Sequence, residues 1–438
     1  MTALIAVPKI RTDRTLKGGN LSLASLTDVL RIGIAGLGEA TTEFLPDYVK
    51  HPKVKVTAAA DFRQAARDRF QQEVKGKAYQ TFEEICQSSE VDIVYIATPH
   101  ELHAQHTLMA LKCGKHVIVE KPMALTVEDC DQMNNEADRR GLKILCGHNH
   151  SYDVPIRKMR EIIRGGELGP LCMINTWNYN DFMVRPYPDF AMETSRGVVL
   201  NQGPHQVDIV RVLGGGMVRT VRARTMTWDQ SRPGEGAYTC YLEFEDGVTA
   251  TLVFNGYGFF DTAELFGWIG ESGAARYPEK HVGARKNYNQ LLTLSQHERV
   301  TQLEDLKTRM RYGNVGLGER PEMPAGWEKG GYRPGIDPDT KHQSFFGLTV
   351  VSCEKGDMRQ SQDNLIIYGD EKREVMLEKG VRRRNGEIDE LYQCLFHGQP
   401  LLHDGRWGAA TVEVCVAMLQ STAERKEIQL SHQVPYRD

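Results

Sequence analysis

Short apolar runs alternate with helical patterns along the first third of the chain. The apolar runs predict strands at residues 30–35, 54–60, 91–97, 116–119 and 143–146. Strands that alternate with helices imply right-handed crossovers, and therefore a parallel sheet covered on both faces. Thr126 and Asp129 predict the start of one helix by a capping box, and Gly141 predicts its end. We therefore expect a doubly wound α/β domain over residues 30–150.

Further along the chain, the apolar positions become longer runs that alternate with polar residues. Asp246 and Gly247 separate two such runs, as is typical of a hairpin turn. The pattern predicts a second α/β domain over residues 151–438, built on a mostly antiparallel sheet. Residues 270–340, rich in Gly, Pro and charge, are expected to form a long excursion from it, and residues 1–29 an N-terminal arm.

Composition narrows the class of partner. Lys and Arg number 54 and Asp and Glu 58, a net charge of −4, and no charge run resembles a nucleic-acid tail. No apolar run approaches the roughly 20 residues that a membrane span needs. Nine cysteines are scattered without a CxxC or metal-like spacing, which indicates free thiols in a reducing cytosol and no metal site. A cytoplasmic protein with a small-molecule partner is expected, with no nucleic acid and no membrane.

Two glycines point to a phosphate-binding turn. Gly36 and Gly38 follow the first expected strand and open a helix, so backbone N–H groups and the helix N-terminus can meet a pyrophosphate. Asp61 ends the second strand, where a carboxylate holds an adenosine ribose in Rossmann domains. The third small position is Thr41 instead of Gly or Ala, which allows a different helix placement. The alternative is a glycine turn in another doubly wound fold.

The acidic residue at the ribose position favours NAD. A 2′-phosphate would meet the Asp61 carboxylate at close range, and like charges so close are costly. Arg63 could bind that phosphate, so NADP remains the alternative. Glu39, the first residue of the helix, is a further expected cofactor contact.

Five sequence blocks occur in a recognisable order. They are the glycine turn, Thr98-Pro99 with His103, GKHVIVEKP at 114–122, GHNHSY at 147–152 and GVVLNQGPHQVD at 197–208. This combination resembles the glucose–fructose oxidoreductase / inositol dehydrogenase / MocA family. The resemblance implies an N-terminal Rossmann domain and a C-terminal α/β domain with a large, mostly antiparallel open sheet that usually mediates oligomer contacts. A homo-oligomer, a dimer or a tetramer, is therefore expected.

In that family the lysine of the EKP block lies near the nicotinamide and the substrate, and here it is Lys121. A cation there stabilises the alkoxide that develops as a hydroxyl loses its proton and its carbon loses hydride. Pro122 restricts Lys121 to extended backbone geometry. A surface lysine at a strand end is the alternative. The residues expected against the cofactor also include Thr98, Pro99, His103 and Glu120.

The second family pair is an Asp four residues before a His, and the matching residues here are Asn201 and His205. His205 is the expected proton acceptor, because an imidazole titrates near neutral pH. The amide of Asn201 can orient a ligand or water but cannot act as a base. Acid–base work is therefore expected to fall on His205 and Lys121. The alternative for His205 is a packed histidine at a helix start.

Two arginines suggest a substrate with a carboxylate. Arg185 and Arg196 stand among aromatic and apolar residues in segment 178–197, and guanidinium groups bind carboxylates through paired hydrogen bonds. His148 and Tyr179 are further expected substrate contacts. The alternative is that either arginine forms an ion pair with a neighbouring acid, namely Asp181, Asp189 or Glu193.

Residues 345–370 are similar to the phthalate 4,5-cis-dihydrodiol dehydrogenase branch of the family. This resemblance implies oxidation of a cis-dihydrodiol of an aromatic carboxylic acid, with hydride transfer to NAD and tautomerisation to a catechol. The alternative in the same family is a sugar, inositol or polyol dehydrogenase. An NAD-dependent glycosidase and a non-enzymatic NAD-binding regulator are the alternatives from other classes.

Overall fold

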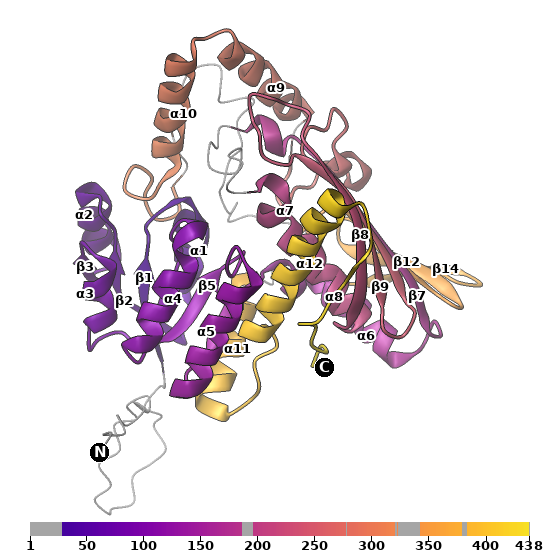
Figure 1. Ribbon diagram of the computed structural model, residues 1–438, viewed down its shortest axis with the longest axis horizontal. Coiled ribbons are helices and arrows are strands. Elements are labelled where there is room, and N and C mark those ends of the chain that lie inside the picture. The colour runs from indigo at the N-terminus through magenta and orange to yellow at the C-terminus, as the bar shows by residue number, and fades with distance from the viewer. Residues whose placement is uncertain are drawn as a thin grey trace, which may run out of the picture.

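The computed structural model describes residues 29–185, 196–276, 278–319, 322, 342–378 and 383–437. The expected N-terminal arm lies outside the described residues except for Val29. Figure 1 shows two sheets side by side, with the long helix α12 (Gly405–Glu424) between them. No helix in the described ranges has the length and apolar character that crossing a membrane requires.

The first sheet has six parallel strands in the spatial order β3-β2-β1-β4-β5-β6. They are β1 (Leu30–Ala35), β2 (Val54–Ala60), β3 (Lys77–Tyr79), β4 (Ile93–Ile96), β5 (His116–Glu120) and β6 (Ile144–Gly147). Helices cover both faces, and this is why the central strands are near-continuous apolar runs. Five strands were expected. β3 was not, because its KAY sequence carries no apolar run.

Five helices pack on this sheet, and the ends of α5 follow from residues in the sequence. They are α1 (Glu39–Lys50), α2 (Gln64–Glu73), α3 (Phe82–Gln87), α4 (His103–Lys112) and α5 (Val127–Arg140). Thr126 caps α5 by accepting a hydrogen bond from the Asp129 N–H, and Gly141 ends it at a φ of 64°. The Asp129 carboxylate accepts from the Thr126 hydroxyl, so the reciprocal half of a capping box is not formed as expected.

The second sheet has nine strands in the order β14-β13-β12-β11-β7-β10-β9-β8-β15. Only the pair β7 and β10 is parallel. The bounds are β7 (Leu171–Tyr179), β8 (Val218–Met226), β9 (Ala237–Phe244), β10 (Thr249–Asn255), β11 (Leu348–Cys353), β12 (Gly356–Gln360), β13 (Asn364–Tyr368), β14 (Lys372–Met376) and β15 (Ile428–Gln429). The predicted fold class, a parallel sheet followed by a mostly antiparallel one, is confirmed.

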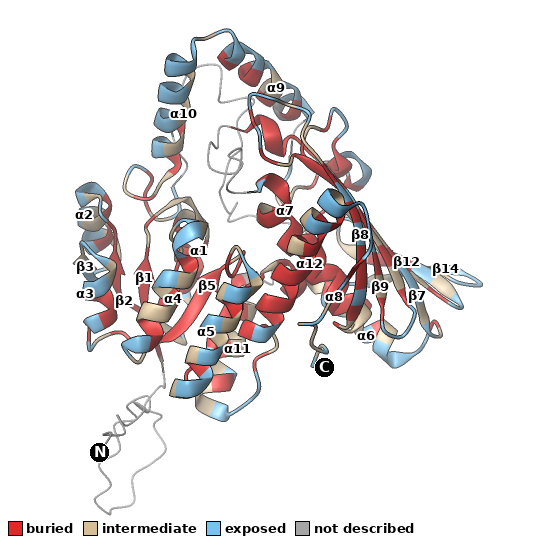
Figure 2. Ribbon diagram, in the orientation of Figure 1, coloured by how far each residue is buried: buried red, intermediate tan, exposed pale blue. Residues whose placement is uncertain are grey.

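One face of the second sheet is covered and the other is open. The covering helices are α6 (Val154–Gly165), α7 (Gly197–Asn201), α8 (Gly203–Gly214) and α12. Figure 2 shows α8 buried along nearly its whole length. Trp177 on β7 and Tyr241 on β9 are exposed, and the strand register places them together on the other face. Short 3-10 helices in the described residues lie at His100–Leu102, His150–Tyr152, Phe182–Val184 and Thr262–Phe266.

The expected excursion reaches from the second sheet back to the first. Helices α9 (Pro278–Leu292) and α10 (Gln296–Met310) run across the top of the molecule in Figure 1. Beyond α10, the buried Tyr312 donates a hydrogen bond from its hydroxyl to Glu73 Oε2 of α2 at 2.8 Å. The described part of the excursion, residues 270–276 and 278–319, therefore contacts the first domain at the end of α2 and just after β2.

The C-terminal helices join the two cores. Helix α11 (Arg383–His397) packs on α1 and β6, and α12 packs on α5, α8 and β8. Ile388 belongs to the core of the first sheet, while Val412 and Val414 of α12 belong to the cores of the first and second sheets respectively. The last part of the chain thus fixes one sheet against the other.

Candidate active site

Lys121 follows the last residue of β5, at the carboxyl edge where open α/β sheets bind ligands. Its side chain is half-buried, and Nζ donates a hydrogen bond to the Asn201 carbonyl oxygen at 2.9 Å, at the end of α7. Burial lowers the pKa of Lys121, and attraction to the Glu120 and Glu271 carboxylates opposes this shift. The ammonium group therefore stands between the first sheet and the helices of the second.

His103 ties the loop after β4 to the lysine segment. The buried ring lies with Nδ1 at 2.8 Å from the Pro122 carbonyl oxygen and Nε2 at 2.9 Å from the Thr98 carbonyl oxygen. The Lys121–Pro122 peptide bond is cis. His103 thus positions the backbone that carries Lys121, where a direct contact with the cofactor was expected. Pro99 lies in the loop that it fixes.

The glycine turn has the geometry of a dinucleotide site. Gly36 has a φ of +93°, and a Cβ there would lie 2.6 Å from the Ala97 carbonyl oxygen, so only glycine fits. A Cβ at Gly38 would meet no described atom within 4 Å, which leaves room for a ligand against the backbone. Thr41, the departure from the fingerprint, is fully buried, and its hydroxyl donates to the Gly36 carbonyl oxygen at 2.6 Å.

Asp61 connects the end of β2 to this turn. Its Oδ2 accepts a hydrogen bond from the Leu37 N–H at 2.8 Å, and its Oδ1 lies 3.0 Å from Arg63 Nε. Arg63 also donates to the carbonyl oxygens of Leu37 and Tyr312. Because these acceptors hold the guanidinium, it is not directed towards a 2′-phosphate. Gly38, Asp61 and the N-terminus of α1, which begins with Glu39, fit the pyrophosphate and ribose of NAD.

Glu120, expected against the cofactor, binds protein side chains in this structure. Its Oε1 accepts hydrogen bonds from the Tyr95 hydroxyl at 2.6 Å and from Arg384 Nη2 at 2.9 Å. Burial raises the pKa of Glu120, but the Arg384 guanidinium, the Tyr95 hydroxyl and the Lys121 ammonium group together lower it below its ordinary value. The alternation of side chains along β5 directs this carboxylate to the face that α11 covers, and there it anchors the C-terminal helix.

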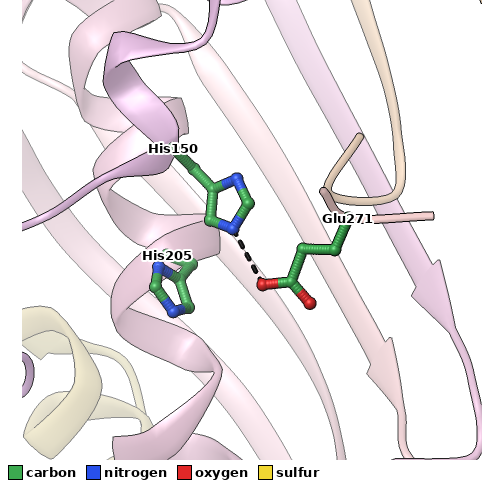
Figure 3. A group of neighbouring side chains, drawn as sticks. All are labelled: His150, His205 and Glu271. Atoms are coloured by element: carbon green, nitrogen blue, oxygen red, sulfur yellow. Dashed lines mark hydrogen bonds and ion pairs between the residues drawn. The ribbon is translucent and has the colours of Figure 1, made fainter. Parts of the chain in front are cut away.

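His205 lies in the first turn of α8 and is buried. Its ring centroid is 4.8 Å from that of His150, with the ring planes at 87°, and Phe346 packs against both rings. Figure 3 shows these two rings beside Glu271, whose Oε1 lies 3.0 Å from His150 Nε2. Sequence reasoning gave no role to His150 or Glu271. The only signal was the GHNHSY block, which contains His150.

The remaining predicted polar residues near His205 differ in their placement. Asn201, the last residue of α7, presents its backbone carbonyl to Lys121, and its side-chain Oδ1 accepts a hydrogen bond from Gln202 Nε2 at 2.7 Å. His148 is buried directly after β6, and burial lowers its pKa to about 4, so the ring is neutral near pH 7. Of these two residues, Asn201 contacts Lys121, and it does so through its backbone carbonyl oxygen.

The structure favours the ion-pair interpretation for Arg185. This side chain is buried, and its Nε lies 3.3 Å from Asp181 Oδ1. Arg196 is exposed at the N-cap of α7. Tyr179 lies on the sheet face that also exposes Trp177, away from α8, because alternate residues of a strand face opposite sides. Tyr179 therefore does not join the residues around His205, and Arg196 stays the predicted partner of a substrate carboxylate.

Comparison with known proteins agrees with this architecture. A model of the GFO/IDH/MocA oxidoreductase family, with an NAD-binding Rossmann fold, matches residues 30–148, and a model of the GFO/IDH/MocA C-terminal domain matches residues 156–273. The chain is 32% identical to 1-carboxy-3-chloro-3,4-dihydroxycyclo hexa-1,5-diene dehydrogenase of Comamonas testosteroni, over 89% of this chain and 94% of that one. The chain belongs to the GFO/IDH/MocA oxidoreductase family.

Two further proteins resemble this chain across most of their own length. A Bordetella bronchiseptica RB50 protein, assigned as a dehydrogenase, has a crystal structure that superposes with a TM-score of 0.80 at 34% identity, covering 92% of this chain and all of that one. Myo-inositol 2-dehydrogenase of Thermotoga maritima is 26% identical over 67% of this chain and 90% of its own length. The predicted family, the NAD cofactor and the assignment as an NAD-dependent dehydrogenase are confirmed.

Proposed function

We propose that this enzyme oxidises a hydroxyl group of a cis-dihydrodiol that carries a carboxylate, phthalate 4,5-cis-dihydrodiol being the expected substrate. The supporting observation is the hydrogen bond from Lys121 to the Asn201 carbonyl, which brings the ammonium group to the start of the His205 helix. The Comamonas relative supports the substrate class, since its name describes a dihydroxylated cyclohexadiene with one carboxyl group.

Alcohol oxidation needs a hydride acceptor, a group that stabilises the alkoxide and a proton acceptor. NAD, when bound, accepts the hydride. Among the described residues, one of the three N–H donors of Lys121 reaches Asn201, and the others can donate to a substrate hydroxyl and stabilise the developing alkoxide. His205, beside it on α8, is proposed to accept the hydroxyl proton.

Arg196 is the proposed partner of the substrate carboxylate. It caps α7, and this helix runs five residues, about 7.5 Å at 1.5 Å per residue, to the Asn201 carbonyl that holds Lys121. Replacing Arg196 by Ala is expected to raise KM about 10- to 100-fold for a carboxylated dihydrodiol, because a charge-assisted hydrogen bond contributes about 1.5–3 kcal/mol. Arg185→Ala serves as the contrast, since its partner is Asp181 and it should mainly lower stability.

The deciding experiment measures NADH formation by absorbance across a substrate panel. The panel contains cis-dihydrodiols with and without carboxylates, myo-inositol, aldoses and a glycoside. Oxidation of the carboxylated dihydrodiols with the highest kcat/KM supports the proposal. Preference for a polyol would replace it, and sugar release from the glycoside without net NADH would indicate a glycosidase.

Inositol or polyol oxidation is the second candidate. It is favoured by the Thermotoga maritima relative, which is a myo-inositol dehydrogenase. A polyol has no carboxylate, so Arg196→Ala would leave KM for a polyol unchanged. The same variant therefore separates the two candidates.

We also propose a homo-oligomer formed through the open face of the second sheet, in a cytoplasmic enzyme. That face exposes large apolar side chains on β7 and β9, namely Met173, Trp177 and Tyr241. All nine cysteines lie in the described residues and are free, which suits a reducing compartment. Light scattering of Trp177→Glu should show a smaller particle than the wild type, and an unchanged particle would contradict the assignment of this face.

A further inference from the structure

Three side chains from distant parts of the chain converge beside the proposed active site. His150 lies in the 3-10 turn after β6, His205 in α8, and Glu271 in the segment that precedes α9. Their ligand atoms, one from each side chain, all lie within 4.8 Å of one another. Figure 3 shows the two imidazoles and the carboxylate beside one another, with a dashed contact between His150 and Glu271.

His150 lies between two carboxylates. Its Nδ1 is 2.8 Å from Asp153 Oδ2, and its Nε2 is 3.0 Å from Glu271 Oε1. A neutral imidazole carries one N–H, so a donor to Asp153 leaves the Nε2 lone pair facing a carboxylate oxygen. That approach is repulsive unless a cation or a second proton is shared there. The bond to Asp153 is also the carboxylate–histidine contact that usually orients a metal-binding imidazole.

We propose that His150 Nε2, His205 and Glu271 bind one divalent transition-metal ion. Two imidazoles and one carboxylate form the donor set of catalytic zinc sites, and imidazole nitrogens favour zinc and its neighbours over magnesium or calcium. This proposal differs from the sequence expectation of no metal, which rested on the absence of a short ligand motif.

The surroundings suit a site that an ion can enter. The imidazole of His150 is fully buried and packs with that of His205 against Phe346, which excludes water from one side. The Glu271 side chain is 40% exposed and provides the access. Three protein ligands leave coordination positions of the ion open. If the proposed function holds, the two neighbouring hydroxyls of a cis-dihydrodiol could occupy these positions as a bidentate ligand.

Metal binding would make His205 a ligand instead of a proton acceptor. The two roles are separable because an ion can be counted without turnover. If the wild type binds no ion but still reduces NAD, the dehydrogenase proposal stands and the metal proposal fails. If it binds an ion but does not oxidise dihydrodiols, the reverse holds.

The test uses the full-length chain, stripped with a chelator and titrated with zinc chloride against a chromophoric chelator. One Zn²⁺ per chain is expected to bind, and Co²⁺ in its place should give the visible absorption of a site with nitrogen and oxygen ligands. Glu271→Gln keeps the shape of the side chain and is expected to weaken Zn²⁺ binding by at least about tenfold. Loss of a residue that only hydrogen-bonds to a metal ligand already weakens metal affinity by about that factor. Glu264→Gln, an exposed glutamate on the 3-10 turn at Thr262–Phe266, is the matched control and should bind as the wild type does.

Two outcomes would overturn the site. One is the absence of saturable Zn²⁺ binding by the wild type. The other is Zn²⁺ binding that Glu271→Gln leaves unchanged, which would place the ion elsewhere. Circular dichroism of each variant checks that it is folded, and His205→Asn provides a second test if Glu271→Gln is unstable.

Discussion

The cofactor turn and the histidine–glutamate cluster are built in opposite ways. The turn, from Gly36 to Asp61, lies within one strand–helix–strand unit, and its backbone makes most of the geometry. The cluster of His150, His205 and Glu271 draws each side chain from a different segment. A local site leaves a spacing that can be read in the sequence, whereas a site assembled from distant segments leaves none.

Lys121 follows a strand of the first sheet and contacts the end of α7 in the second domain. Its replacement should have the largest effect on catalysis of the changes considered. We expect Lys121→Ala to lower kcat about 10²- to 10³-fold, the usual cost of losing one donor to a developing oxyanion. NAD binding should change little, because the glycine turn is intact. Steady-state kinetics and NAD titration measure the two effects. Lys143→Ala, an exposed lysine before β6, is the control, and equal activity of the two variants would disprove the role of Lys121.

His116 opens the strand that Lys121 follows, and it should make stability depend on pH. Burial lowers the pKa of His116 to about 4, and Nδ1 accepts a hydrogen bond from the Lys143 N–H at 3.0 Å. The unfolded chain therefore binds the proton more tightly between about pH 6.5 and 4, so stability is lost as pH falls through that window, by up to about 3 kcal/mol. Denaturant unfolding of His116→Asn should show a flatter pH dependence. An identical dependence would contradict the assignment.

The two glycines of the turn should separate folding from cofactor binding. Gly36→Ala forces a Cβ against the Ala97 carbonyl at a positive φ and should destabilise the fold by about 1–3 kcal/mol. In Gly38→Ala the added Cβ contacts no described atom, so the free energy of unfolding should stay within about 0.5 kcal/mol of the wild-type value. The same Cβ should weaken NAD binding, because it would occupy space next to the turn. Thermal unfolding and NAD titration of both variants check this. Normal NAD binding by Gly38→Ala would mean that the dinucleotide does not pass there.

Tyr312 should give the smallest effect. Tyr312→Phe removes the hydroxyl that donates to Glu73 but keeps the buried ring, so a loss of about 0.5–1.5 kcal/mol in unfolding free energy is expected. Denaturant unfolding measures it. Thr308→Ala, which changes a hydroxyl on the nearby α10, should cost less, and the reverse order would show that the Glu73 contact contributes nothing.

The sequence predicts the parts that depend on periodicity and turn chemistry. Apolar runs located five of the six strands of the parallel sheet, and the glycines with Asp61 predicted the cofactor turn. It did not predict that Glu120 would pair with Arg384 or that Tyr179 would lie on the face of Trp177, because the side-chain environment of a strand residue depends on elements distant in the chain. It gave no role to Arg384 or Glu271, because their partners lie more than 100 residues away along the chain.

A crystal structure with NAD and a carboxylated cis-dihydrodiol bound tests the central claim most directly. The quantity to measure is the distance from Lys121 Nζ to the substrate hydroxyl whose carbon faces the nicotinamide. The account predicts a hydrogen bond of roughly 2.7–3.2 Å. A lysine nitrogen directed into solvent, with the hydroxyl bound by other groups, would contradict it.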